Sequence, residues 1–204
     1  EAGHAFHTLA AQKEDIHHYQ HAPLEFCEVA SMSMELIGNE HLEEFYSEEE
    51  ATRARREHLE GIITIFPWIA TVDAFQHWIY THPNHTREER DAQWMELRAR
   101  FGGDIDWAGH EQSHTKLWHR QLHIFLIPFY YIEYGIAQLG ALWVWKNSKD
   151  NRAKALADYK NALALGGSRP LPELFQAAGA PFSFDIEAFK PLIELVQTEL
   201  TALK

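Results

Sequence analysis

The chain has 204 residues, of which 46% are hydrophobic, and carries a net charge of −12 at pH 7. This length and hydrophobic content suffice to bury one sizeable core, so we expect a single domain over residues 1–204. The excess of acidic residues would repel a phosphate backbone or an anionic lipid surface. These properties argue against nucleic-acid and membrane partners.

Targeting and redox features are sparse. The single cysteine, Cys27, excludes an internal disulfide and favours a reducing compartment, so we expect a cytoplasmic location. The first residues show no signal-peptide pattern and no initiator methionine, which predicts that the chain is part of a longer protein. Fourteen histidines are a high number and hint at metal binding, because imidazole is a common metal ligand.

Helical periodicity dominates the sequence from end to end. Apolar residues recur at spacings of three and four, and strand-like alternation is nearly absent, so the predicted fold class is all-α. Ser47 and Thr86 have the character of N-caps, and Pro67 should kink the long helix that contains it. A helix is also expected to start or bend at Pro128. The predicted helices span about 1–13, 24–37, 48–80, 86–101, 128–146, 151–165, 171–178 and 185–203.

The chain begins with the residues Glu1-Ala-Gly-His4, which match the last four positions of His-Glu-x-x-His. In that motif two histidines on one helical face bind zinc, and the glutamate between them activates a water molecule. The motif fragment alone is weak, because the same spacing recurs at Glu14/His17 and Glu111/His114. Taken alone, a solvated helix face explains it better.

A second predicted helix carries acids at helical spacing, namely Glu25, Glu28 and Glu35. A catalytic zinc takes three protein ligands, so two histidines from one helix and a glutamate from the next would complete a site. His4 and Glu28 are 24 residues apart, which leaves room for a connection between two helices. On spacing alone, solvent-facing acids are an equally good interpretation.

Three separated blocks of sequence resemble the oligoendopeptidase F branch of the thimet-oligopeptidase-like zinc peptidases. The blocks are Glu-Ala-Gly-His-Ala-Phe-His at 1–7, the acid-bearing segment 25–35, and His123 followed by Pro-Phe-Tyr-Tyr-Ile-Glu-Tyr at 128–134. Segments 66–80 and 166–175 are also similar, so the resemblance covers most of the chain. It implies a C-terminal catalytic part that forms one wall of a deep substrate channel, with an N-terminal part of the same protein as the other wall.

The resemblance implies a zinc-dependent endopeptidase that hydrolyses short peptides, with one zinc ion per active site. It implies His4 and Glu28 as zinc ligands, Glu1 as the general base and Glu25 as a carboxylate that orients a ligand imidazole. The first histidine of the motif would precede Glu1. An isolated chain is therefore expected to bind zinc poorly and to be inactive.

The resemblance also implies functional residues in the aromatic segment. Tyr134 is the expected donor to the oxyanion formed during peptide hydrolysis. His123 and Tyr131 are expected to contact the peptide backbone near the scissile bond. Tyr130 is a further candidate for substrate binding, although its ring is as well explained as core packing.

Several residues have simpler structural explanations. His7 is best interpreted as helix packing or as support for the ligands, and Cys27 as a small buried thiol. Gly3 fits a place where another backbone approaches closely. Two other functions remain open from the residues alone: a di-iron carboxylate bundle built from the three Glu-x-x-His pairs, and a non-enzymatic helical scaffold.

Overall fold

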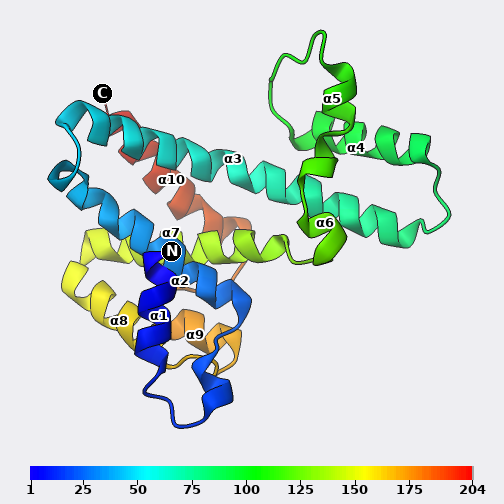
Figure 1. Cartoon of the computed structure of the whole chain (residues 1–204). Helices are drawn as coiled ribbons and strands as arrows, with labels where there is room; N and C mark the ends of the chain where they lie inside the picture. The colour runs from blue at the N-terminus through cyan, green and yellow to red at the C-terminus, as the bar shows by residue number, and fades with distance from the viewer. Residues whose placement is uncertain (204) are drawn as a thin grey trace. The chain divides into compact units, whose positions relative to one another are not determined.

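A computed structural model describes residues 1–203, and all regular structure within that range is helical (Figure 1). The predicted all-α class is therefore confirmed. Short 3₁₀ helices η1 (His17–Gln20), η2 (Asn39–Glu44) and η3 (Leu117–Arg120) lie between the longer elements. The α-helices are α1 (Ala2–Ala11), α2 (Leu24–Gly38), α3 (Glu48–Thr81), α4 (Arg87–Phe101), α5 (Glu111–Thr115), α6 (His123–Leu126), α7 (Ile132–Asp150), α8 (Arg152–Ala164), α9 (Leu171–Ala177) and α10 (Ile186–Ala202).

The chain divides into two compact units, and each is described by itself. Unit 1 consists of residues 1–60 and 136–204, and unit 2 of residues 61–135. The boundaries fall inside α3 and inside α7, so each of these helices contributes to both units. No helix in the described range is both long and apolar enough to span a membrane.

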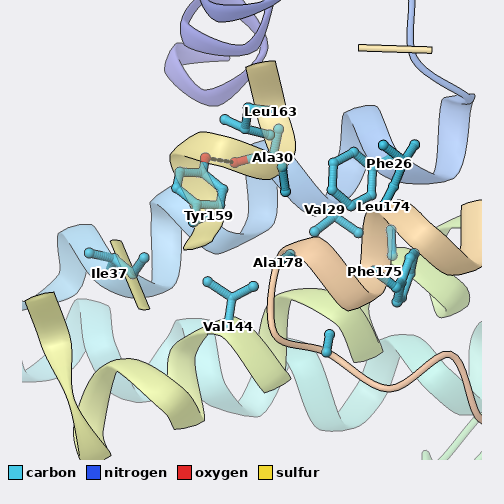
Figure 2. Close-up of a cluster of buried hydrophobic side chains, with 13 residues drawn as sticks. Phe26, Val29, Ala30, Ile37, Val144, Tyr159, Leu163, Leu174, Phe175 and Ala178 are labelled. Carbon is cyan, nitrogen blue, oxygen red and sulfur yellow. Dashed lines mark hydrogen bonds between the residues drawn. The ribbon is translucent and has the colours of Figure 1, made fainter. Parts of the chain in front are cut away.

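The core of unit 1 is built where α2 meets α7, α8 and α9 (Figure 2). Phe26 and Val29 from α2 pack with Phe175 from α9, and each of these side chains is at most 1% exposed. The hydroxyl of Tyr159 donates a hydrogen bond of 2.6 Å to the carbonyl of Ala30, which satisfies this buried phenol. Since α1 packs on α2 and α8, this core also supports the helix that begins the chain.

A separate aromatic core holds unit 2 together. Phe75 from α3 contacts the rings of Trp94 from α4 and Trp118 from η3, with centroids 5.1 and 5.5 Å away. Trp94 is fully buried, and its indole N–H donates to the carbonyl of His114 at 3.1 Å. Tyr131, 7% exposed, belongs to the same core.

The N-termini of α4, α8 and α10 follow from local capping chemistry. Thr86 accepts a hydrogen bond from the backbone N–H of Glu89, whose carboxylate accepts one in return, so the predicted capping box is present. Asn151 and Asp185 cap α8 and α10 through their side-chain oxygens, which accept from the backbone N–H groups of Lys154 and Ala188. Pro67 lies within α3, which continues past it.

The segment before α7 differs from the prediction. Pro128 neither starts nor bends a helix: α6 ends at Leu126 and α7 begins only at Ile132. A residue before proline avoids the helical conformation, and Ile127 accordingly has φ −139° and ψ 74°. Phe129 then takes a positive φ of 63°, a backbone conformation that a continuous right-handed helix does not contain. The segment 110–131 is therefore a series of short helical pieces.

Gly3 allows α1 to approach α2 closely. A Cβ atom at this position would lie 2.5 Å from the carbonyl oxygen of Ala30 and 2.5 Å from the Cα atom of Ser31. Contacts that short cannot be relieved by a side-chain rotation, because both partner atoms belong to the backbone. The interpretation of Gly3 as a site of close backbone approach is confirmed.

Replacing Gly3 by alanine is expected to lower the free energy of unfolding by about 1–3 kcal/mol, because α1 would have to move away from α2. Gly61 in α3 is a matched control, since a Cβ added there meets nothing within 4 Å. Gly61→Ala should instead stabilise the protein by up to about 1 kcal/mol through helix propensity. Urea denaturation of both variants measures the difference, and equal effects would contradict the packing argument.

Candidate metal and catalytic site

The close packing of α1 on α2 brings His4 and Glu28 together. The Nε2 atom of His4 lies 3.6 Å from the Oε2 atom of Glu28, and the two side chains are 36% and 19% exposed. His4 is on α1 and Glu28 is on α2, one turn after Leu24 begins that helix. Two potential metal ligands that are 24 residues apart in the sequence thus meet on adjacent helices.

Glu1 occupies the N-cap position of α1, one turn before His4. Its side chain makes no capping hydrogen bond, and the residue is exposed. The carboxylate therefore makes no hydrogen bond to the helix end, although its negative charge there is favourable to the helix dipole. It is also close enough to Glu28 to influence the titration of that residue.

The electrostatic environment of Glu28 favours a nearby cation. Burial raises the pKa of the Glu28 carboxyl, the neighbouring His4 opposes this effect, and Glu1 and Glu35 raise the pKa further. A partly buried carboxylate with acidic neighbours is stabilised in its charged form by a positive charge. A bound divalent ion would supply such a charge.

The His4 and Glu28 pair fits one zinc ion in its donor chemistry. Imidazole nitrogen and carboxylate oxygen are both zinc ligands, at about 2.0–2.2 Å from the metal. Two such atoms around a tetrahedral ion are about 3.3–3.5 Å apart, close to the 3.6 Å between Nε2 and Oε2. No group of three or more His, Cys, Asp and Glu side chains within residues 1–203 converges on a metal position. The described residues therefore present two ligands.

His7 packs into the core and does not join this pair. It is 5% exposed, and its ring meets that of Phe26 edge to face with centroids 6.0 Å apart. Burial lowers the pKa of His7 to about 4, with a smaller contribution from His4. The imidazole is therefore neutral at pH 7, as expected for a histidine that serves in packing.

Glu25 and Cys27 flank the pair in sequence. The contact of Glu25 with a ligand imidazole stays a prediction, because the first histidine of the motif would precede Glu1. The Cys27 thiol donates a weak hydrogen bond to the carbonyl of Ala22 at 3.7 Å. Burial raises the pKa of this thiol, and Glu28 and Glu25 raise it further, which disfavours a reactive thiolate.

The predicted aromatic residues gather within unit 2 around His123. The ring of Tyr130 stacks on the imidazole at 5.6 Å between centroids, and those of Tyr131 and Tyr134 meet it edge to face at 5.1 and 5.7 Å. The Tyr134 hydroxyl lies 3.3 Å from Nε2 of His123. Burial raises the pKa of Tyr131, so its phenol stays protonated at neutral pH.

Two residues that the sequence did not single out for this cluster complete it. Gln121 Nε2 lies 2.5 Å from Nδ1 of His123, and the indole N–H of Trp68 donates to Oε1 of Gln121 at 3.3 Å and to the Tyr131 hydroxyl at 3.0 Å. Trp68 is 53 residues from Gln121 in the sequence, and no local pattern connects them.

The other two Glu-x-x-His pairs are used locally. Glu14 and His17 lie after the end of α1, and His17 begins η1. Glu111 accepts a hydrogen bond from the backbone N–H of Gly109, and His114 stacks on Trp107 with centroids 4.4 Å apart. The Nε2 atom of His114 also accepts a hydrogen bond from Arg98 at 3.4 Å. These contacts give the Glu111/His114 pair a structural explanation.

Comparison with known proteins identifies the family. The model of peptidase family M3 matches residues 1–186, and the chain belongs to this family. This membership favours a peptidase over the di-iron bundle and the scaffold. A search of curated proteins gave no match.

Solved structures narrow the resemblance to the oligoendopeptidase branch. A 3.1 Å structure described as an oligoendopeptidase F is 36% identical, with a TM-score of 0.90 over 98% of this chain and 36% of its own. An oligoendopeptidase F from Bacillus anthracis is 33% identical, with a TM-score of 0.80 over 99% of this chain and 33% of its own. PZ peptidase A with an inhibitor is 32% identical, with a TM-score of 0.90 over 99% and 36%. The chain thus spans about a third of these structures.

Proposed function

We propose that this chain is the catalytic part of a zinc-dependent endopeptidase that hydrolyses short peptides. The observation that carries the proposal is the approach of His4 and Glu28 to 3.6 Å across two adjacent helices, with Glu1 one turn before His4. Membership of peptidase family M3 supports the same conclusion. Two further ligand positions are needed for a catalytic zinc, one from protein and one left open for water.

We assign a distinct proposed task to each candidate residue. His4 and Glu28 would hold one zinc ion, which when bound lowers the pKa of water and polarises the peptide carbonyl. Glu1 takes a proton from the attacking water and returns it to the leaving amine. The Tyr134 hydroxyl donates a hydrogen bond to the developing oxyanion, and His123, Tyr131 and Tyr130 bind the peptide.

The partners follow from the same proposal. The substrates are oligopeptides, and the remainder of the same protein supplies the other wall of the channel.

Glu25 would orient a ligand imidazole by accepting its free N–H. A cytoplasmic location stays a prediction. The isolated chain is expected to be inactive, because His4 and Glu28 provide two ligands where a catalytic zinc needs three.

Metal analysis of the full-length parent protein tests the proposal. We expect one zinc ion per chain, cleavage of a quenched fluorescent peptide, and loss of both after chelation. His4→Ala or Glu28→Gln should weaken zinc binding by more than the roughly 10- to 100-fold typical of changes in the groups that orient a ligand. His18→Ala, at an exposed histidine of the connection after α1, is the matched control and should retain zinc. Two irons per chain, or no metal, would contradict the proposal.

A further inference from the structure

A chain of hydrogen-bonding groups runs from Trp68 to Tyr134 within unit 2. The indole N–H of Trp68 lies 3.3 Å from Oε1 of Gln121, whose Nε2 lies 2.5 Å from Nδ1 of His123. The Nε2 atom on the other side of that imidazole lies 3.3 Å from the Tyr134 hydroxyl. Amide and imidazole groups can each be oriented in two ways, so the direction of this chain depends on its first member.

The first member, Trp68, can only donate, because an indole has one N–H and no acceptor. Its ring is held in place by Trp94, which meets it edge to face at 5.7 Å, and by the guanidinium groups of Arg98 and Arg120 at 5.5 and 5.8 Å. The amide oxygen of Gln121 must therefore face the indole. The reverse orientation would place two donors 3.3 Å apart.

The orientation of Gln121 determines the protonation of His123. With its oxygen toward Trp68, the amide presents an N–H donor to Nδ1 of His123, so Nδ1 must be the unprotonated nitrogen of the ring. A neutral imidazole then carries its proton on Nε2. That Nε2–H donates to the oxygen of Tyr134. In the opposite tautomer, the unprotonated Nε2 would instead accept a hydrogen bond from the Tyr134 hydroxyl.

We infer that Trp68 and Gln121 are positioning residues that hold His123 as the Nε2–H tautomer and so keep the Tyr134 hydroxyl proton free to point at substrate. The Tyr131 hydroxyl is in the same situation. Its oxygen accepts a hydrogen bond from Trp68 at 3.0 Å, so its own proton remains available for another acceptor. One donor-only indole thus prepares two phenols as donors. The catalytic consequence rests on the proposed function, whereas the proton positions do not.

Neutron diffraction from crystals of the full-length parent protein in D₂O reads the proton positions directly. We expect deuterium on Nε2 of His123, none on Nδ1, and a Tyr134 hydroxyl deuteron that points away from the imidazole. Deuterium on Nδ1 would overturn the inference. This measurement requires no activity, so a parent that cleaves no peptide would refute the proposed function while an Nε2 deuteron would still support the network.

Kinetics of two Gln121 variants separate tautomer control from simple packing. In Gln121→Glu the carboxylate still accepts from Trp68 but can only accept from His123, so it draws the proton to Nδ1 and turns Nε2 into an acceptor for Tyr134. Loss of one oxyanion donor predicts that kcat and kcat/KM fall together by about 10²-fold. In Gln121→Met the imidazole is unconstrained, and the loss should be smaller.

A purely structural Gln121 predicts the reverse order, because glutamate retains the hydrogen bond from Trp68 and methionine does not. A greater loss in Gln121→Met than in Gln121→Glu would therefore overturn the inference. Gln112→Glu makes the same change of charge at an exposed residue of α5 and should leave kcat unchanged. If Gln121→Glu does not fold, Trp68→Phe, which removes the indole N–H and retains an aromatic ring, should lower kcat and return deuterium to Nδ1 in part of the molecules.

Discussion

Replacing Glu1 by glutamine in the full-length parent protein is expected to lower kcat on a quenched fluorescent peptide by about 10²- to 10⁴-fold. Glutamine has nearly the same shape as glutamate but cannot take a proton from water, so only the proton transfer is lost. Since His4 and Glu28 are untouched, the zinc content should equal that of the unmodified protein. The combination of retained metal and lost turnover is expected for a general base and not for a metal ligand.

Glu14→Gln is the matched control for this experiment, because Glu14 has the same spacing to a histidine but lies beyond the end of α1. Its kcat should be unchanged. An unchanged kcat in Glu1→Gln would exclude Glu1 as the base. A fall in kcat together with a loss of zinc would instead point to a contribution of Glu1 to metal binding. The pH dependence of kcat would then be informative, since removal of the base should abolish its acidic limb.

Tyr134→Phe in the full-length parent should lower kcat by about 10²- to 10³-fold, the range found when one oxyanion donor is removed. The ring packs against His123, Tyr130 and Tyr131, so phenylalanine keeps these contacts and loses only the hydroxyl. Because the donor acts on the transition state, kcat/KM should fall as far as kcat.

Tyr80→Phe provides the control for the loss of a phenol, since Tyr80 is 54% exposed and lies near the end of α3. Its kinetics should match those of the unmodified protein. A Tyr134→Phe variant with normal kcat would transfer the donor role to Tyr131 or exclude a tyrosine donor altogether, and Tyr131→Phe distinguishes these two outcomes. Thermal unfolding of each variant confirms that the fold is retained.

The helices and their ends could be predicted because their causes are local. A threonine followed three residues later by glutamate forms the capping box of α4, and asparagine and aspartate cap α8 and α10. Such contacts involve residues within one helical turn. The prediction failed around Pro128, where Phe129 takes a positive φ and its backbone N–H donates to the side chain of Gln76, 53 residues away.

In the candidate site, too, some residues could be named from the sequence, whereas those that act through long-range contacts could not. His4 and Glu28 could be named from motif spacing and resemblance, and the aromatic residues around His123 fall within one short segment. Gln121 and Trp68 could not, because their importance arises from contacts between segments far apart in the sequence. A glutamine and a tryptophan in a helical pattern look like any other packing residues.

Residue chemistry over a few neighbouring positions was therefore enough to predict an all-helical chain, and the family resemblance was needed to name Glu1, His4, Glu28 and Tyr134 as candidates. The folded chain alone decides that α1 lies against α2 closely enough, at Gly3, for His4 to reach Glu28. It also decides which ring nitrogen of His123 carries the proton, because that position depends on every donor and acceptor in contact with the imidazole. Distances between non-neighbouring atoms are properties of packing, which no local pattern encodes.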